Sequence, residues 1–210
     1  GGRGCPVCRA AVVAAGNYLA FLATVAQARG PDAGPALALR LCGAHAWRSL
    51  ELLSPGAAAR LWQPAARAIR RAMGGPSPGP PQPDGGCCPA CRYRAAAERR
   101  ASRALLRALE GGQSGRDGVG AGELCLPHLA LSLRLSPGGR LGRVLIGEQA
   151  AAIEALCADL DEYIRKQDYD CRERPGPEAD SPWRAMSRVV GVEGLGAGAL
   201  AWGPGARRKG

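Results

Sequence analysis

The chain has 210 residues and a formal net charge of +10, from 28 basic and 18 acidic side chains. Apolar residues make up 46% of it, which excludes a wholly disordered chain, whereas aromatic residues make up only 4%. A core with so few aromatic side chains has to be built from alanine, leucine and valine. Alanine-rich cores suit closely packed helices, so the composition predicts an all-α fold.

The first predicted helix follows the opening CPVC motif and runs through an apolar stretch to Arg29. Residues 10–28 of this stretch carry no charge and are nearly long enough to span a bilayer. The stretch is rich in alanine and contains polar residues, a composition that inserts poorly into membranes. We therefore interpret it as a buried core helix and expect no membrane association. The sequence shows no signal-peptide pattern.

An internal repeat is the strongest feature of the sequence. Four residues recur at a constant offset of 83, and both histidines of the protein belong to the set. The first copy holds Cys5, Cys8, Cys42 and His45, and the second holds Cys88, Cys91, Cys125 and His128. Both copies read C-P-x-C-x33-L-C-x2-H, which indicates a duplicated module.

The spacing of these residues is typical of metal ligands. A C-x2-C pair lets two thiolates reach one ion, and the C-x2-H pair completes a closed, tetrahedral Cys3His set of the kind found in structural zinc sites. We expect two zinc ions, one per module, with each CPxC and CxxH pair at a helix N-terminus. Iron and a redox dithiol at each CPxC are the alternatives.

The remaining cysteines point to a reducing compartment. The chain has nine cysteines, and an odd count argues against a fully paired disulfide framework, so we predict a cytoplasmic protein. Cys157 falls in the apolar series of a helix and is predicted to be buried. Cys171, in a polar segment, is the best candidate for a free thiol, whereas Cys87 is predicted to be a bystander beside Cys88.

Composition shifts divide the chain into five predicted segments. Zinc module 1 covers residues 1–73 and contains a helix after CGAH and another that begins at Ser54-Pro55, with a kink at Pro64. A linker rich in proline and glycine covers residues 74–86, and zinc module 2 covers 87–136. Residues 137–190 form a long helix, at about 143–167, and a tail that pack on the modules. Residues 191–210 are predicted to be disordered.

Arginines form a stripe at helical spacing in module 2, at Arg92, Arg99, Arg103 and Arg107. A solvated helix face is the simplest interpretation. Docking against the acidic segment 144–190 and nucleic-acid binding are the alternatives, although the stripe has no aromatic residues for base stacking and matches no known nucleic-acid motif.

The combination of motifs resembles a family of bacterial proteins of unknown function that carry two CPxC…LCxxH modules and a DYRF…EADSW tail. The matching segments are Cys5–Cys8, Leu41–Trp47, Cys88–Cys91, Leu124–His128, Arg165–Tyr169 and Glu178–Ser181. The chain departs from the family pattern at Asp170-Cys171 and at Pro182, which separates Ser181 from Trp183. The resemblance implies the helical fold and the metal sites, and it implies no activity.

Three functions are compatible with these features. The first is a non-enzymatic, zinc-stabilised helical protein that acts through a surface as an interaction or scaffold protein. The second is a zinc–thiolate redox sensor. The third is an enzyme that uses the tail carboxylates Asp168, Glu178 and Asp180 with Lys166, although such groups more often form a salt-bridge latch.

Overall fold

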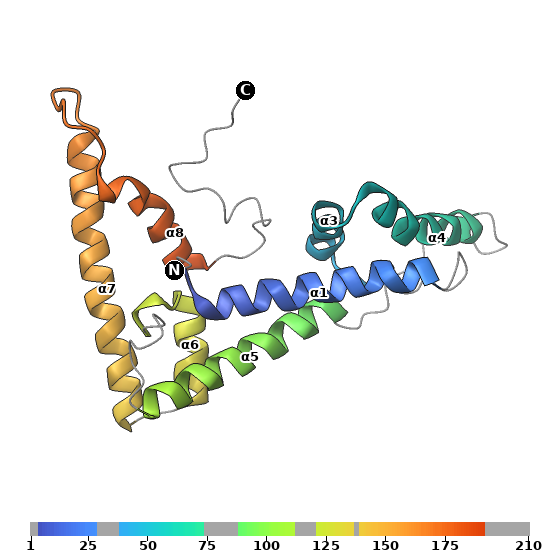
Figure 1. Cartoon of the computed structure of the whole chain (residues 1–210), viewed down its shortest axis with the longest axis horizontal. Helices are drawn as coiled ribbons and strands as arrows, with labels where there is room; N and C mark the ends of the chain where they lie inside the picture. Colours follow the sequence, from blue (N-terminus) through green and yellow to red (C-terminus); the bar gives the residue numbers. More distant parts are fainter. Residues whose placement is uncertain (1–3, 29–37, 74–87, 112–120, 137–138, 192–210) are drawn as a thin grey trace. The chain divides into compact units, whose positions relative to one another are not determined.

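The computed structural model describes residues 4–28, 38–73, 88–111, 121–136 and 139–191 (Figure 1). These ranges form helices and contain no strand, so the predicted all-α fold is confirmed. The elements in chain order are α1 (Pro6–Ala28), α3 (Gly43–Leu52), α4 (Pro55–Met73), α5 (Pro89–Glu110), η1 (Ala121–Glu123), α6 (Leu126–Leu135), α7 (Gly139–Lys166), η2 (Pro177–Asp180) and α8 (Ser181–Val190).

The helix starts agree with the local sequence signals. Pro6 and Pro89 occupy the first positions of α1 and α5, where the missing N–H of proline costs nothing. Pro55 begins α4 as predicted, and Pro64 lies inside that helix, where it is buried. The C-terminal α7 ends at Arg165 and Lys166, whose charges suit a helix C-terminus.

The chain divides into two compact units that are not the two sequence repeats. Unit 1 comprises residues 1–10 and 97–210, and unit 2 comprises residues 11–96. The helix α1 therefore begins in unit 1 and ends in unit 2, whereas α5 begins in unit 2 and ends in unit 1. Each unit combines residues from both repeats. The predicted linker 74–86 and residues 192–210 of the predicted tail lie outside the described residues.

Each unit has a small aliphatic core. In unit 1 the buried cluster includes Val7, Leu105, Leu124 and Leu145, and in unit 2 it includes Leu19, Leu22 and Leu61 with several alanines. No buried hydrophobic side chain of the described part is aromatic. The core composition predicted from the sequence is thus confirmed.

The apolar helix α1 contributes to both cores. By length and composition its segment Pro6–Val25 could cross a membrane, and it is the single such helix in the described part of the chain. Val7 and Cys8 nevertheless lie in the core of unit 1, and Leu19 and Leu22 are fully buried in unit 2. Of the apolar window of α1, 39% is buried inside the protein.

The long helix α7 buries only part of its apolar series. Gly142, Leu145, Gln149 and Leu156 are buried, whereas Ile146 and Ile164 are largely exposed. Cys157 is exposed as well, so the prediction that it is buried was wrong. Cys157 directly follows the buried Leu156, and consecutive residues of a helix point about 100° apart, which turns the Cys157 side chain away from the core.

Candidate metal centres

The eight predicted ligand residues gather in two quartets, each with three cysteines and one histidine. We call Cys5, Cys8, Cys125 and His128 site 1, and Cys42, His45, Cys88 and Cys91 site 2. Within each quartet all ligand atoms lie within 4.8 Å of one another. Site 1 lies in unit 1 and site 2 lies in unit 2. The ligands belong to the starts of α1, α3, α5 and α6, at or directly before the first helical turn.

The grouping of the ligands differs from the predicted one. Each quartet takes its CPxC pair from one repeat and its CxxH pair from the other, so the expectation of one ion held within each sequence module was wrong. Helix α1 begins in unit 1 with the CPxC pair of the first repeat and continues in unit 2. There Tyr18 of α1 stacks on Tyr93 of α5, with ring centroids 4.7 Å apart, and Cys42 and His45 lie beside the CPxC pair at the start of α5.

The distances within site 1 suit a tetrahedral ion. Bonds of ~2.3 Å to sulfur and ~2.0–2.1 Å to nitrogen place neighbouring ligand atoms about 3.5–3.8 Å apart. The Nδ1 atom of His128 lies 3.1 Å from Cys125 Sγ, 3.3 Å from Cys8 Sγ and 3.5 Å from Cys5 Sγ. The Sγ atoms of Cys8 and Cys125 are 3.6 Å apart. The donor set therefore closes around a single small cation.

Site 2 has the same geometry with slightly longer distances. The Nδ1 atom of His45 lies 3.2 Å from Cys42 Sγ, 3.4 Å from Cys91 Sγ and 3.7 Å from Cys88 Sγ. The Sγ atoms of Cys42 and Cys91 are 3.8 Å apart. Both quartets use the Nδ1 atom of their histidine, as expected for a repeated local motif.

Helix N-termini position every ligand pair. Cys42 and Cys125 are the N-cap residues of α3 and α6, with extended backbone at φ −70°, ψ 162° and φ −75°, ψ 160°. The histidine three residues later lies in the first helical turn, which puts its ring beside the thiol. Each quartet thus lies at two helix N-termini, whose positive partial charge stabilises thiolates and the net negative charge of a Cys3His site with a divalent ion.

The two sites differ in burial. At site 1 the relative exposures are 3% for Cys5, 4% for Cys8, 1% for Cys125 and 6% for His128. At site 2 Cys88 and His45 are buried, but Cys42 and Cys91 are partly exposed. Solvent and small reagents therefore reach two of the sulfurs of site 2 more easily than any sulfur of site 1.

The surroundings of the two histidines differ as well. Burial lowers the pKa of His128, but hydrogen bonds with Cys125, Cys5 and Glu98 outweigh it and raise the pKa to about 11. The Glu98 Oε1 atom lies 3.5 Å from His128 Nε2, the arrangement in which a carboxylate orients a metal-binding imidazole. Burial, Arg94 and Arg48 together lower the pKa of His45.

These directions set the sign of the pH dependence at site 1. An ion that binds His128 Nδ1 competes with a proton there, and the raised pKa strengthens that competition. Metal affinity at site 1 therefore falls as the pH falls. The pKa of His45 is lowered instead, so a proton competes less strongly with an ion at that ring.

Three residues that the sequence did not single out complete site 1. The buried Gln149 donates from Nε2 to the Leu124 carbonyl at 2.9 Å, and Arg188 Nη1 donates to the same oxygen at 3.3 Å. Leu124 directly precedes Cys125, so these bonds from α7 and α8 fix the start of α6. Gly191 adopts φ 77°, and a Cβ atom there would lie 3.2 Å from Cys125 Sγ and 3.4 Å from Cys8 Sγ. Of these three residues, only Gln149 could have been noticed in the sequence, because it is a polar residue on an otherwise apolar helix face.

A side chain at position 191 should weaken site 1. Gly191 has φ 77° and ψ 179°, a conformation that is essentially restricted to glycine and costs other residues ~1–3 kcal/mol. We expect Gly191→Ala to lower the free energy of unfolding of unit 1 by about that amount. It should also release the metal of site 1 to a competing chelator at lower chelator concentration, while site 2 keeps its metal.

Gly147→Ala is the matched control for this substitution. Gly147 lies in α7 of the same unit, and a Cβ atom there meets nothing within 4 Å. Alanine favours a helix over glycine, so this variant should be neutral or slightly more stable. Equal metal retention by the two variants would contradict a role for Gly191 in closing site 1.

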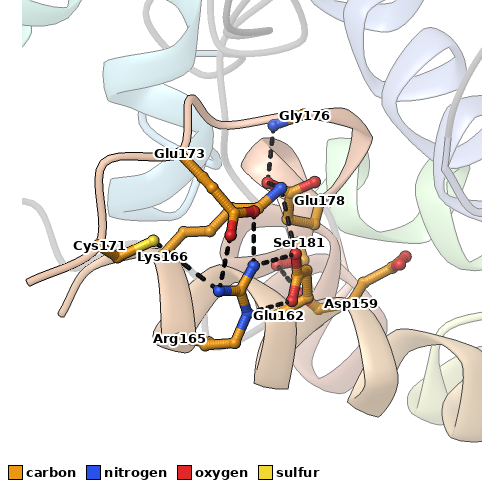
Figure 2. A network of polar contacts seen from close by, with 9 residues as sticks. All are labelled: Asp159, Glu162, Arg165, Lys166, Cys171, Glu173, Gly176, Glu178 and Ser181. Atoms are coloured by element: carbon orange, nitrogen blue, oxygen red, sulfur yellow. Dashed lines mark hydrogen bonds and ion pairs between the residues drawn. The ribbon is translucent and has the colours of Figure 1, made fainter.

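The C-terminal acidic residues form an ion-pair network rather than a free carboxylate cluster. Lys166 Nζ lies 3.0 Å from Glu178 Oε1, which also accepts the Gly176 N–H at 2.7 Å (Figure 2). The Gly176 N–H, the N–H of Glu178 itself and Lys166 lower the pKa of Glu178. This is the latch that such residues most often form, here between the end of α7 and η2.

The other two tail carboxylates do not join that pair. Asp180 lies 2.7 Å from Arg184 Nε, and the same guanidinium is 2.7 Å from Asp159 through Nη2. Asp168 is exposed. The predicted catalytic set of Lys166 with three carboxylates is therefore divided among separate contacts.

Cys171 lies in the same part of the chain and is partly exposed. Its sulfur accepts a hydrogen bond from Arg165 Nη1 at 3.8 Å, beside the Arg165–Glu173 ion pair (Figure 2). Among the described cysteines it lies outside both quartets together with Cys157. Cys87 lies outside the described residues.

The arginine stripe of α5 is directed to solvent. Arg92, Arg99, Arg103 and Arg107 are all exposed, and residues on other faces of the helix, among them Ala97, Leu105 and Leu106, are buried. This arrangement supports the interpretation as a solvated helix face.

Comparison of the chain with protein-family models, with curated proteins and with solved structures found no match.

Proposed function

We propose that the protein is a non-enzymatic zinc protein in which two ions fasten the two repeats together and hold a helical surface for a partner. The observation that carries the proposal is the pair of Cys3His quartets, each assembled from both repeats with spacing that suits one tetrahedral ion. A closed set of four protein ligands leaves no position for an activated water, which is the mark of a structural site.

Zinc is the metal that fits the donor set best. Thiolates alone accept several soft metals, but a mixed set of three thiolates and one imidazole in tetrahedral spacing is most often a zinc site. Thiolate ligands have to remain reduced, which supports the cytoplasm as the compartment. We also propose that the chain belongs with the bacterial proteins that share its paired CPxC…LCxxH motifs.

Metal analysis tests this proposal directly. Protein purified under reducing conditions without added metal should contain about two metal equivalents per chain, chiefly zinc, because two closed quartets are present. Elemental analysis of the dialysed protein measures the content. Less than one metal equivalent per chain would contradict the proposal. A metal content dominated by iron, with visible absorption, would show that the sites bind iron instead of zinc.

A redox sensor is the second candidate, and the partial exposure of site 2 favours it. Cys42 and Cys91 lie 3.8 Å apart and are both partly exposed. Two thiolates, two protons and one hydrogen peroxide give a disulfide and two water molecules, and loss of two ligands releases the ion. Such chemistry would make site 2 a switch and leave site 1 structural.

Peroxide should therefore release zinc in two phases. We expect the first equivalent to leave with oxidation of Cys42 and Cys91, and the second, from buried site 1, at least several-fold more slowly, because oxidation follows thiolate access. A zinc-sensitive dye gives the kinetics, and peptide mapping gives the oxidised residues. Cys157→Ser and Cys171→Ser are controls that should leave both phases unchanged. Release of both equivalents at one rate would contradict the difference between the sites.

A further inference from the structure

An apolar groove of about 700 Å³ lies between α3 and α4 in unit 2. Its walls include Trp47 and Leu50 from α3 and Trp62 and Ile69 from α4, and all of its lining residues are apolar. Trp47 is 73% exposed and Leu50 is 49% exposed. Large apolar side chains gathered at one open groove, in a protein with so few aromatics, indicate a docking surface.

The charge around the groove is positive. The helix α4 carries four arginines and no acidic residue, and the only acidic residue of α3, Glu51, is paired with Arg48 at 3.0 Å. Arg70 is exposed and follows the groove residue Ile69, which places it at the flank of the groove face of α4. Unit 2 as a whole has nine arginines against three acidic residues. This positive charge favours an acidic binding partner, because it raises the rate of association and complements the charge of the partner in the complex.

The groove is coupled to the metal of site 2. Ala46 and Trp47 line the groove and follow the site 2 ligand His45 in α3. The hydroxyl of Ser49, fully buried in α3, accepts a hydrogen bond from Trp62 Nε1 at 3.0 Å, which ties α4 to α3. An ion bound by Cys42 and His45 thus fixes the helix that forms one wall.

We propose that this groove binds an amphipathic helix of a partner protein that has large apolar side chains on one face and acidic residues beside them. Apolar anchors of such a helix, spaced at i, i+3, i+4 and i+7, enter the groove, while its carboxylates meet Arg70. This inference deepens the proposed interaction role and depends on it through the metal of site 2.

The test uses the zinc-loaded full chain and two synthetic 16-residue peptides with the same leucine and phenylalanine face. One peptide carries glutamate and the other lysine at the remaining positions, and fluorescence anisotropy gives the dissociation constants. We expect the acidic peptide to bind at least ten-fold more tightly, and Trp47→Ala to weaken it at least ten-fold. Arg70→Glu should reduce the preference for the acidic peptide.

Phe21→Ala is the matched control, because Phe21 is 58% exposed in the same unit and does not line the groove. It should leave both constants unchanged. Equal binding of the two peptides, or no effect of Trp47→Ala, would overturn the proposal. A wild-type dimer that Trp47→Ala converts to a monomer would instead assign the groove to a second copy and would also overturn it.

The metal content of the same samples separates the two proposals. Two zinc equivalents without peptide binding would overturn the groove proposal and leave the metal sites intact. Protein without metal would overturn the proposed function. Circular dichroism confirms that each exposed-residue variant keeps its helices.

Discussion

If the chain is cut between its repeats, we expect the two fragments to remain associated as long as the zinc ions are bound. A protease site placed in residues 74–86 separates residues 1 to about 80 from the rest without touching any ligand. Cys5, Cys8, Cys42 and His45 then belong to the first half, and the other four ligands belong to the second. Because each quartet draws ligands from both halves, each ion is a cross-link between them.

Gel filtration of the cut protein measures the result. With zinc, we expect one species with the mass of the whole chain and two metal equivalents. With a strong chelator, the halves should separate, because the aliphatic clusters that remain bury little surface and small cores seldom hold without a staple. The uncut protein with the same inserted site is the control in both buffers.

Two outcomes of this experiment would contradict the structure. If the halves separate in zinc buffer and each keeps one ion, the four ligands of each site come from a single repeat. Halves that remain together in chelator would show that packing rather than metal joins the repeats.

Loss of either histidine ligand is expected to unfold one unit and not one repeat. His45→Ala removes a ligand from site 2, and His128→Ala removes one from site 1. A structural zinc site contributes ~10–16 kcal/mol of apparent binding free energy at pH 7, which matches or exceeds the ~5–15 kcal/mol stability of a typical domain. Each substitution should therefore cost one zinc equivalent and most of the cooperative melting of its unit.

Alkylation of cysteines identifies which unit has opened. In His45→Ala we expect Cys42, Cys88 and Cys91 to react quickly, while Cys5, Cys8 and Cys125 stay protected. In His128→Ala we expect the opposite pattern: the cysteines of site 1 should react quickly and those of site 2 should stay protected. Each variant is therefore the matched control for the other. Reaction of Cys5, Cys8 and Cys42 together in His45→Ala would instead support a site within the first repeat.

Chelation of the wild type extends the same test. Removal of both ions should abolish the thermal transition of at least one unit. An apo protein that melts within a few degrees of the zinc form would show that the metal is not structural. Such a result would favour a redox function for the cysteines.

The sequence by itself determined the ligand candidates and the helical character of the chain. These are local properties: a cysteine that caps a helix and a histidine in its first turn depend on spacing alone, and Pro6, Pro55 and Pro89 mark helix starts by their missing N–H groups. The aliphatic core followed from composition, because a chain with so few aromatic residues has no others to bury.

Only the tertiary structure decided which ligands share an ion. Two identical motif pairs can combine within a repeat or between repeats, and the motifs themselves look the same in both cases. In the folded chain Cys8 groups with Cys125 in unit 1 and Cys42 groups with Cys91 in unit 2, and these contacts are long-range ones that no local pattern specifies. Gln149, Arg188 and Gly191 were missed for the same reason, since each acts on site 1 through contacts far apart along the chain.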